Sequence, residues 1–110
     1  MALTIAAGFN AFAAPHAPKK DYTDYYYIYN GLQNTLARET PANYVISANP
    51  TSDPFCPGGS NECAVQISFI TGTELLSLSY AQRLTFDSNG FPIGQSPGAI
   101  GVFKRNETKV

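Results

Sequence analysis

The chain has 110 residues, which is the length of one small domain and excludes a two-domain architecture. Seven basic and eight acidic side chains give a net charge of −1. The basic excess that phosphate binding requires is missing, so we expect no nucleic-acid partner. One histidine and two cysteines cannot by themselves supply the ligands of a structural zinc site. The sequence carries no motif for catalysis, a cofactor or a metal ion.

The amino terminus has the pattern of an export signal. Residues 1–13 carry no charge and end in the small-residue pattern Ala11-Phe12-Ala13. An apolar run followed by Ala-x-Ala is typical of a secretory signal peptide, with cleavage expected before Ala14. A signal normally opens with Lys or Arg, so we expect the printed sequence to begin inside a longer signal. The alternative is an apolar helix belonging to the domain, because Ala-rich segments form helices readily.

The two cysteines, Cys56 and Cys63, are separated by six residues that include a Pro-Gly-Gly-Ser-Asn run. An even cysteine count in an exported chain predicts a disulfide, and the turn-forming run brings near neighbours together. The spacing is not the Cys-x-x-Cys of thiol oxidoreductases. We therefore predict a Cys56–Cys63 disulfide. The alternative is a pair of free, buried thiols in a cytosolic protein.

The first predicted element is a tyrosine-rich strand over residues 22–29, because aromatic and β-branched residues favour strands. Strand alternation places Tyr25, Tyr27 and Tyr29 on one face. If exposed, this face would form a flat platform for sugar rings or a peptide. The alternative, which the small number of aliphatic residues favours, is that these rings supply the core.

A tight turn is predicted at Asn30-Gly31, because both residues tolerate a positive φ. The return strand of this hairpin would cover 32–38. Leu32 and Leu36 also fit one turn of a helix, so a helix over this segment is the alternative.

The middle of the chain predicts two strands around a long loop. The β-rich run over 44–47 is short, and residues 49–62 are rich in Pro and Gly, which indicates a loop. Residues 63–70 alternate apolar and polar side chains, which predicts a half-buried strand with Val65, Ile67 and Phe69 facing inward.

The segment after this strand is ambiguous. Thr71 and Glu74 have capping-box spacing, which favours a short helix over 75–83. The same residues alternate well enough to form a strand instead.

The last part of the chain predicts a second hairpin and a final strand. Residues 84–87 and 91–93 flank Ser-Asn-Gly, and Pro92 restricts the return strand to a sheet edge. A strand over 100–103 and a polar tail complete the chain. The acidic residues are scattered, so the sequence does not indicate the paired carboxylates of a glycosidase.

Together these elements predict a mainly β fold of small antiparallel hairpins, or an α+β fold with one short helix, held by one disulfide. The expected organisation is a signal peptide at 1–13, a spacer at 14–21, a single domain at 22–105 and a tail at 106–110. Once the signal is removed, no membrane span is expected.

The segments Tyr25-Tyr26-Tyr27-Ile28-Tyr29, Cys56-Pro57-Gly58-Gly59-Ser60 and Cys63-Ala64, together with the leader, resemble short exported proteins of Bacteroidota-type Gram-negative bacteria. The resemblance implies export to the periplasm or the exterior, and a disulfide, but no activity. We therefore expect a non-enzymatic structural or interaction protein without a cofactor. The alternative is a small carbohydrate- or peptide-binding module that uses the tyrosine face, with a glycan or a protein as its partner.

Overall fold

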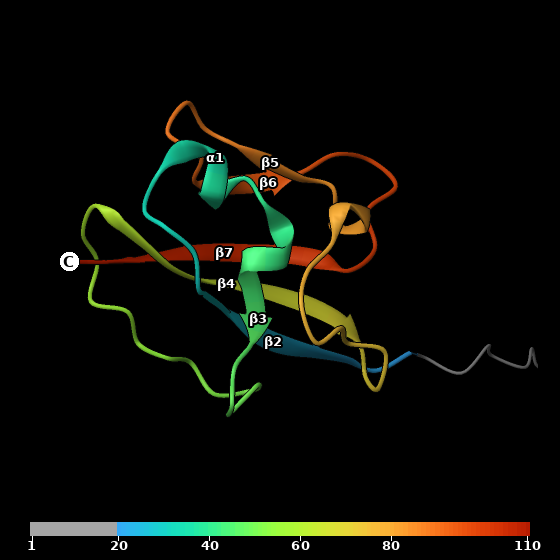
Figure 1. Cartoon of the computed structure of the whole chain (residues 1–110). Coiled ribbons are helices and arrows are strands. Elements are labelled where there is room, and N and C mark those ends of the chain that lie inside the picture. The colour runs from blue at the N-terminus through green and yellow to red at the C-terminus, as the bar shows by residue number, and fades with distance from the viewer. Residues whose placement is uncertain (1–19) are drawn as a thin grey trace, which may run out of the picture.

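The computed structural model describes residues 20–110 (Figure 1). One antiparallel sheet has four strands in the order β3-β2-β4-β7, and a second sheet consists of β5 and β6. The elements are β2 (Tyr22–Tyr29), α1 (Thr35–Arg38), η2 (Pro41–Asn43), β3 (Tyr44–Ile46), β4 (Asn61–Ile70), η3 (Tyr80–Gln82), β5 (Leu84–Phe86), β6 (Pro92–Gln95) and β7 (Val102–Lys109). The predicted mainly β fold with one short helix is confirmed. The predicted signal peptide at 1–13 and most of the spacer lie outside the described residues.

The core lies on one face of the four-stranded sheet. Tyr25 pairs with Ile67 and Tyr27 pairs with Val65 across β2 and β4, so alternate residues of both central strands point to the same side. Elements of the second layer, α1 and β5 among them, cover this side (Figure 1). The buried cluster contains Tyr25, Tyr27, Tyr29, Tyr44, Val65, Ile67, Phe69 and Leu78.

The predicted hairpin at Asn30-Gly31 is wrong, and the helical alternative for 32–38 is correct at α1. Both edges of β2 are already occupied, by β3 and by β4, so no edge remains for a return strand. Glycine at position 31 allows a close approach to Tyr29, because a Cβ there would lie 2.7 Å from the Tyr29 hydroxyl oxygen. The side chain of Asn34 caps α1 by accepting a hydrogen bond from the Ala37 amide at 2.9 Å.

The predicted helix over 75–83 is also wrong. The chain runs extended beside β3, where the Ile46 amide donates to the Leu76 carbonyl at 2.7 Å and the Leu78 amide donates to the Tyr44 carbonyl at 3.0 Å. A capping box does occur, but Ser79 and Gln82 form it around the single turn η3. Packing of Leu78 into the core decides this conformation, since an extended path places that side chain against the tyrosines.

The second hairpin is confirmed, with β5 and β6 joined by a turn at 87–91. The Asp87 carboxylate accepts hydrogen bonds from the Asn89 and Phe91 amides, each at 2.9 Å. Pro92 begins β6, which pairs only with β5 within the described residues, as an edge position requires.

The predicted tail is wrong, because β7 continues to Lys109 and pairs with β4 along its length. The domain therefore extends beyond its predicted boundary at 105. The sequence over 104–109 is polar because β7 is the last strand of its sheet, and an outer strand keeps many of its side chains in water. Likewise, β4 begins at Asn61, two residues before the predicted start at Cys63.

Candidate functional site

The predicted tyrosine platform is not an exposed surface. Tyr25, Tyr27 and Tyr29 lie in the core, and none is more than 6% exposed. The Tyr27 hydroxyl donates to the Leu75 carbonyl at 2.8 Å and accepts from the Leu75 amide at 3.2 Å. Burial raises the pKa of Tyr27 to about 12. The core alternative is correct, because all three rings belong to the buried cluster.

The predicted disulfide between Cys56 and Cys63 is confirmed, with their Cα atoms 6.2 Å apart. It connects the long loop to β4, the strand next to β7. The loop is also hydrogen-bonded to β7 itself: the Gly58 amide donates to the Thr108 carbonyl at 2.8 Å, and the Gly59 amide donates to the Thr108 hydroxyl at 3.2 Å. The segment between the two cysteines is therefore fixed against the sheet.

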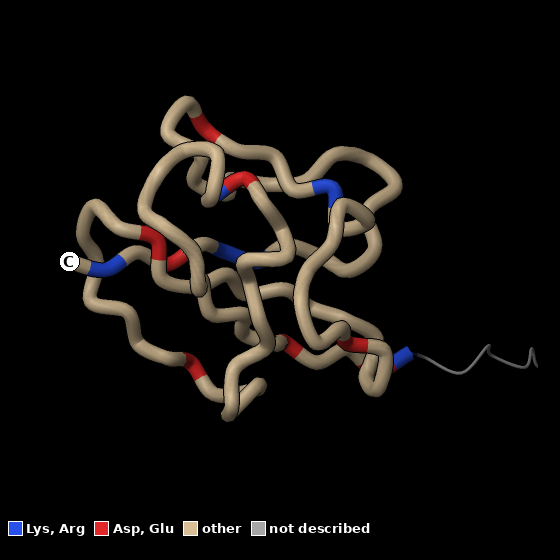
Figure 2. Tube along the Cα trace, in the orientation of Figure 1, with Lys and Arg blue, Asp and Glu red and all other residues tan. Residues whose placement is uncertain are grey.

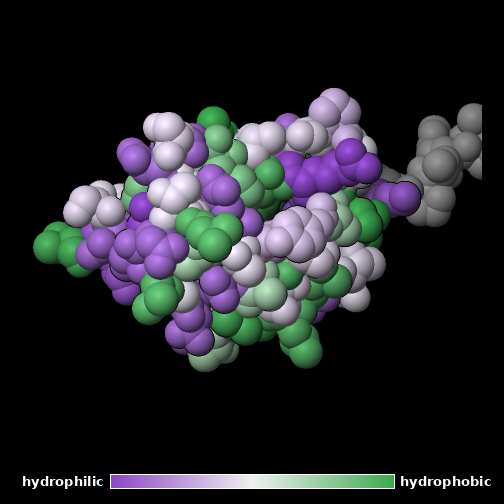
Figure 3. Space-filling model, turned by 45° about the horizontal axis from the view of Figure 1, so that its top comes forward, coloured by the Kyte–Doolittle hydropathy of each residue, from purple (hydrophilic) through white to green (hydrophobic). Residues whose placement is uncertain are grey.

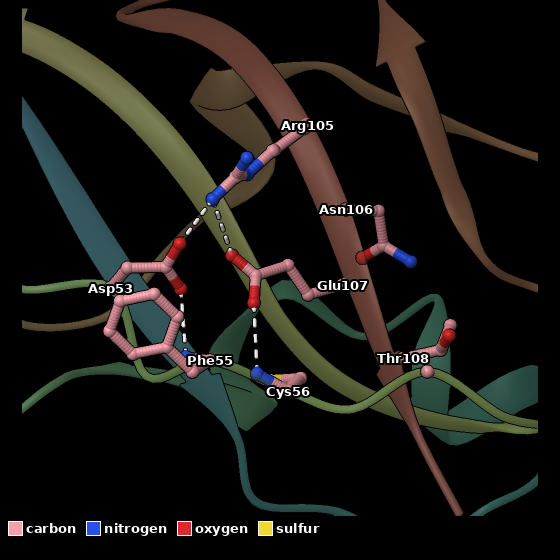
Figure 4. A pocket seen from close by; sticks show the side chains of 8 residues that line it. Asp53, Phe55, Cys56, Arg105, Asn106, Glu107 and Thr108 are labelled. Carbon is pink, nitrogen blue, oxygen red and sulfur yellow. Dashed lines mark hydrogen bonds and ion pairs between the residues drawn. The ribbon is translucent and has the colours of Figure 1, made fainter.

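An open hollow of about 340 Å³ lies between this loop and β7 (Figure 4). It is the candidate functional site. Its lining combines an aromatic side chain, the first cysteine of the disulfide and a group of charged side chains. The lining residues are Asp53, Phe55, Cys56, Gly58, Arg105, Asn106, Glu107 and Thr108.

Arg105 organises the charged side of the hollow. Its guanidinium forms ion pairs with Asp53 and, at 3.2 Å, with Glu107 (Figure 4). Each carboxylate in turn holds a loop amide: Asp53 accepts from Phe55 at 2.8 Å, and Glu107 accepts from Cys56 at 3.2 Å. The hydrogen bond from the Phe55 amide holds the pKa of Asp53 below its usual range. One arginine thus positions two successive backbone amides of the loop.

Phe55 is the unusual residue of this loop. Its φ of 55° lies in the left-handed region, which a bulky side chain rarely adopts, and its ring is 80% exposed. Backbone strain of this kind persists only where surrounding contacts over-determine the conformation, and it concentrates at ligand-contact sites. The Asp53 hydrogen bond and the neighbouring disulfide provide those contacts here.

The sequence alone does not indicate this site. The sequence places Glu107 in a tail and Asp53 in a loop about fifty positions away, and only the contacts of this loop with β7 bring them together. The local signal that was available is the Asp53-Pro54-Phe55-Cys56 run, in which an aspartate precedes a proline, a combination that favours turns.

A second polar cluster lies inside the protein. The Glu62 carboxylate is fully buried at the start of β4 and accepts a hydrogen bond from the Asn106 side-chain amide at 2.8 Å. Tyr44 and Arg38 lie next to it, and both are buried. Asn106 lies in an Asn-x-Thr glycosylation sequon, but its amide nitrogen is engaged by Glu62.

Among residues 20–110, no three His, Cys, Asp or Glu side chains gather as a metal site would require. In the same part of the chain, no helix has the length and apolar character needed to cross a bilayer. No protein-family model, curated protein or solved structure matches the sequence or its fold.

Proposed function

We propose that this chain is an exported, non-enzymatic interaction protein of the cell envelope or exterior, and that it binds a protein partner through Phe55 and the hollow beside it. The observation that carries this proposal is the exposed Phe55 ring on a loop held in a strained conformation. The disulfide supports export, because such bonds persist in oxidising compartments.

A fixed aromatic side chain is a favourable anchor for a protein interface. Binding energy concentrates in a few residues, and a group already held in its bound conformation loses little entropy on association. The loop beneath Phe55 is held by the Arg105 network and by the disulfide, so its conformation does not have to be ordered on binding.

The shape of the hollow favours a macromolecular partner over a small molecule. Small-molecule pockets enclose most of the ligand surface, whereas this hollow is open to solvent along one side. Elsewhere, on the face turned forward in Figure 3, apolar side chains stand in small groups among polar ones. Along the part of the chain that the structure describes, basic and acidic positions are interspersed in Figure 2.

We expect Phe55→Ala to weaken partner binding by about 30-fold, as for a typical hot-spot residue, with the fold unchanged because the ring is exposed. The measurement is capture from envelope extract on the immobilised protein, followed by titration of the captured partner. Leu36→Ala is the matched control, because Leu36 is 78% exposed but lies on α1. Equal affinity of Phe55→Ala and Leu36→Ala for the captured partner contradicts the proposal.

Arg105→Gln tests the role of the network separately. This change removes both ion pairs but keeps the Phe55 side chain itself. We expect weaker binding through a slower association rate, because the loop that carries Phe55 is then less fixed. An unchanged association rate contradicts a positioning role for Arg105, and the Phe55 result then stands alone.

A further inference from the structure

Glu62 lies where several segments of the fold meet. Around its carboxylate are Asn106 from β7, Tyr44 from β3 and Arg38 from α1. Its backbone is held by the Gln33 side chain: the Glu62 amide donates to Gln33 Oε1 at 2.8 Å, and Gln33 Nε2 donates to the Glu62 carbonyl at 3.0 Å. The same residue therefore joins β4, β7 and the segment leading into α1.

A β-bulge turns Glu62 toward the core. The register between β4 and β7 shifts between Glu62 and Ala64, which leaves Cys63 as the extra residue. Without the bulge, strand alternation would place Glu62 on the same side as Ala64, away from the core face of Val65. The acidic side chain is thus placed inside by the backbone geometry of the strand.

Within residues 20–110, this carboxylate forms no ion pair, because the ion pairs there are those of Arg105. The neighbouring Arg38 guanidinium donates to the Asn89 carbonyl from Nε at 3.0 Å and from Nη2 at 2.8 Å, and stacks over Phe91 with 4.4 Å to the ring centroid. Glu62 Oε2 is buried without a hydrogen-bond partner. An ionised carboxylate in this position carries a large desolvation cost, whereas a neutral carboxylic acid does not.

We propose that Glu62 is a proton-binding switch: it holds a proton in the native protein on the acidic side of neutrality, and loss of that proton loosens the junction between β4, β7 and the segment at 33–38. We expect the two hydrogen bonds between the Gln33 side chain and the Glu62 backbone to weaken when Glu62 loses its proton, because they hold the residue that becomes charged. This inference does not depend on partner binding by Phe55.

The surrounding groups support titration at Glu62 itself. Burial raises the pKa of Glu62 to about 7, although the Asn106 hydrogen bond, Tyr44 and Arg38 all lower it. The other titratable groups that face it are Tyr44 and Tyr29, whose pKa values burial raises further above neutrality. Glu62 is therefore the member of the cluster that changes charge near pH 7.

The direction of the pH effect follows from linkage. The folded pKa of about 7 exceeds the reference value of 4.5, so the native state binds the proton more tightly than the unfolded chain. The stability contributed by Glu62 is full below pH 4.5, decreases between 4.5 and 7, and is lost above 7. Between these limits, the unfolding equilibrium constant is expected to increase by about 300-fold from this group.

The first test is a carbon-13 NMR titration of the Glu62 carboxyl in the wild-type protein, assigned through its bonded neighbours. We expect a midpoint near 7, with the side-chain amide signals of Gln33 moving at the same midpoint. A midpoint near the reference value of a glutamate overturns the proposal, as does a Gln33 signal that is independent of pH. This measurement needs no variant to fold.

The second test compares urea unfolding at pH 5 and pH 9 in the wild type, Glu62→Gln and Glu39→Gln. Glu39, just after α1, is the charge-matched control. We expect the wild type and Glu39→Gln to share a pH dependence that Glu62→Gln lacks. An identical pH dependence in all three proteins overturns the proposal.

Discussion

Replacing Tyr27 by Ala is expected to lower the free energy of unfolding by about 3 to 5 kcal/mol, as for a large aromatic side chain removed from a core. The Tyr27 ring is completely buried and packs edge-on against Phe69 with ring centroids 6.2 Å apart. Its removal also leaves both the amide and the carbonyl of Leu75 without their partner. Chemical denaturation followed by tyrosine fluorescence or circular dichroism measures this loss.

Two further variants separate the causes of the Tyr27 effect. Tyr27→Phe keeps the ring and removes only the hydroxyl, so we expect a smaller loss of about 1 to 3 kcal/mol from the unpaired Leu75 groups. Tyr22→Ala alters the same strand at a position that is 57% exposed, and we expect less than about 0.5 kcal/mol. If Tyr27→Ala is no more damaging than Tyr22→Ala, the tyrosine face is not the core.

The paired substitution Cys56→Ser with Cys63→Ser is expected to lower the free energy of unfolding by about 2.5 kcal/mol, from the entropy of closing a short loop in the unfolded chain. The effect is large for a domain of this size, whose core is small. The measurement is denaturant unfolding of the oxidised wild type and the serine variant in parallel.

The wild type with its disulfide reduced provides the internal control for this prediction. It should unfold at the same denaturant concentration as the serine variant, since both lack the same crosslink. A reduced protein as stable as the oxidised one contradicts the prediction. The Arg105 network does not replace the disulfide, because it acts on the folded state and leaves the unfolded chain unconstrained.

Local sequence patterns correctly predicted the elements that are determined by residues close together in the chain. The alternation in 63–70 predicted β4, and the aromatic run in 22–29 predicted β2. The turn after Phe86 predicted the β5–β6 hairpin. The disulfide was predicted because its two cysteines are close in the chain and a turn-forming run separates them. In each case the deciding residues lie within about ten positions of one another.

Elements decided by distant partners were not predictable in this way. Asn30-Gly31 is a strong hairpin signal, but β3 and β4 already pair with β2. The polar residues of β7 resemble a tail until β4 is present as their partner. For the same reason the sequence did not identify Glu62 as buried, since the bulge that turns it inward arises from the pairing of β4 with β7.

The sequence by itself determined that this protein is a small, mainly β domain with a tyrosine-rich strand and one disulfide. These properties follow from composition, from the alternation of apolar and polar residues and from short spacings, none of which depends on contacts between distant parts of the chain. Only the tertiary structure decided that the tyrosines form the core, that Phe55 stands exposed beside Arg105, and that Glu62 lies buried with no ion pair among residues 20–110. Burial and charge pairing depend on which strands meet, and strand pairing depends on contacts between residues far apart in the chain.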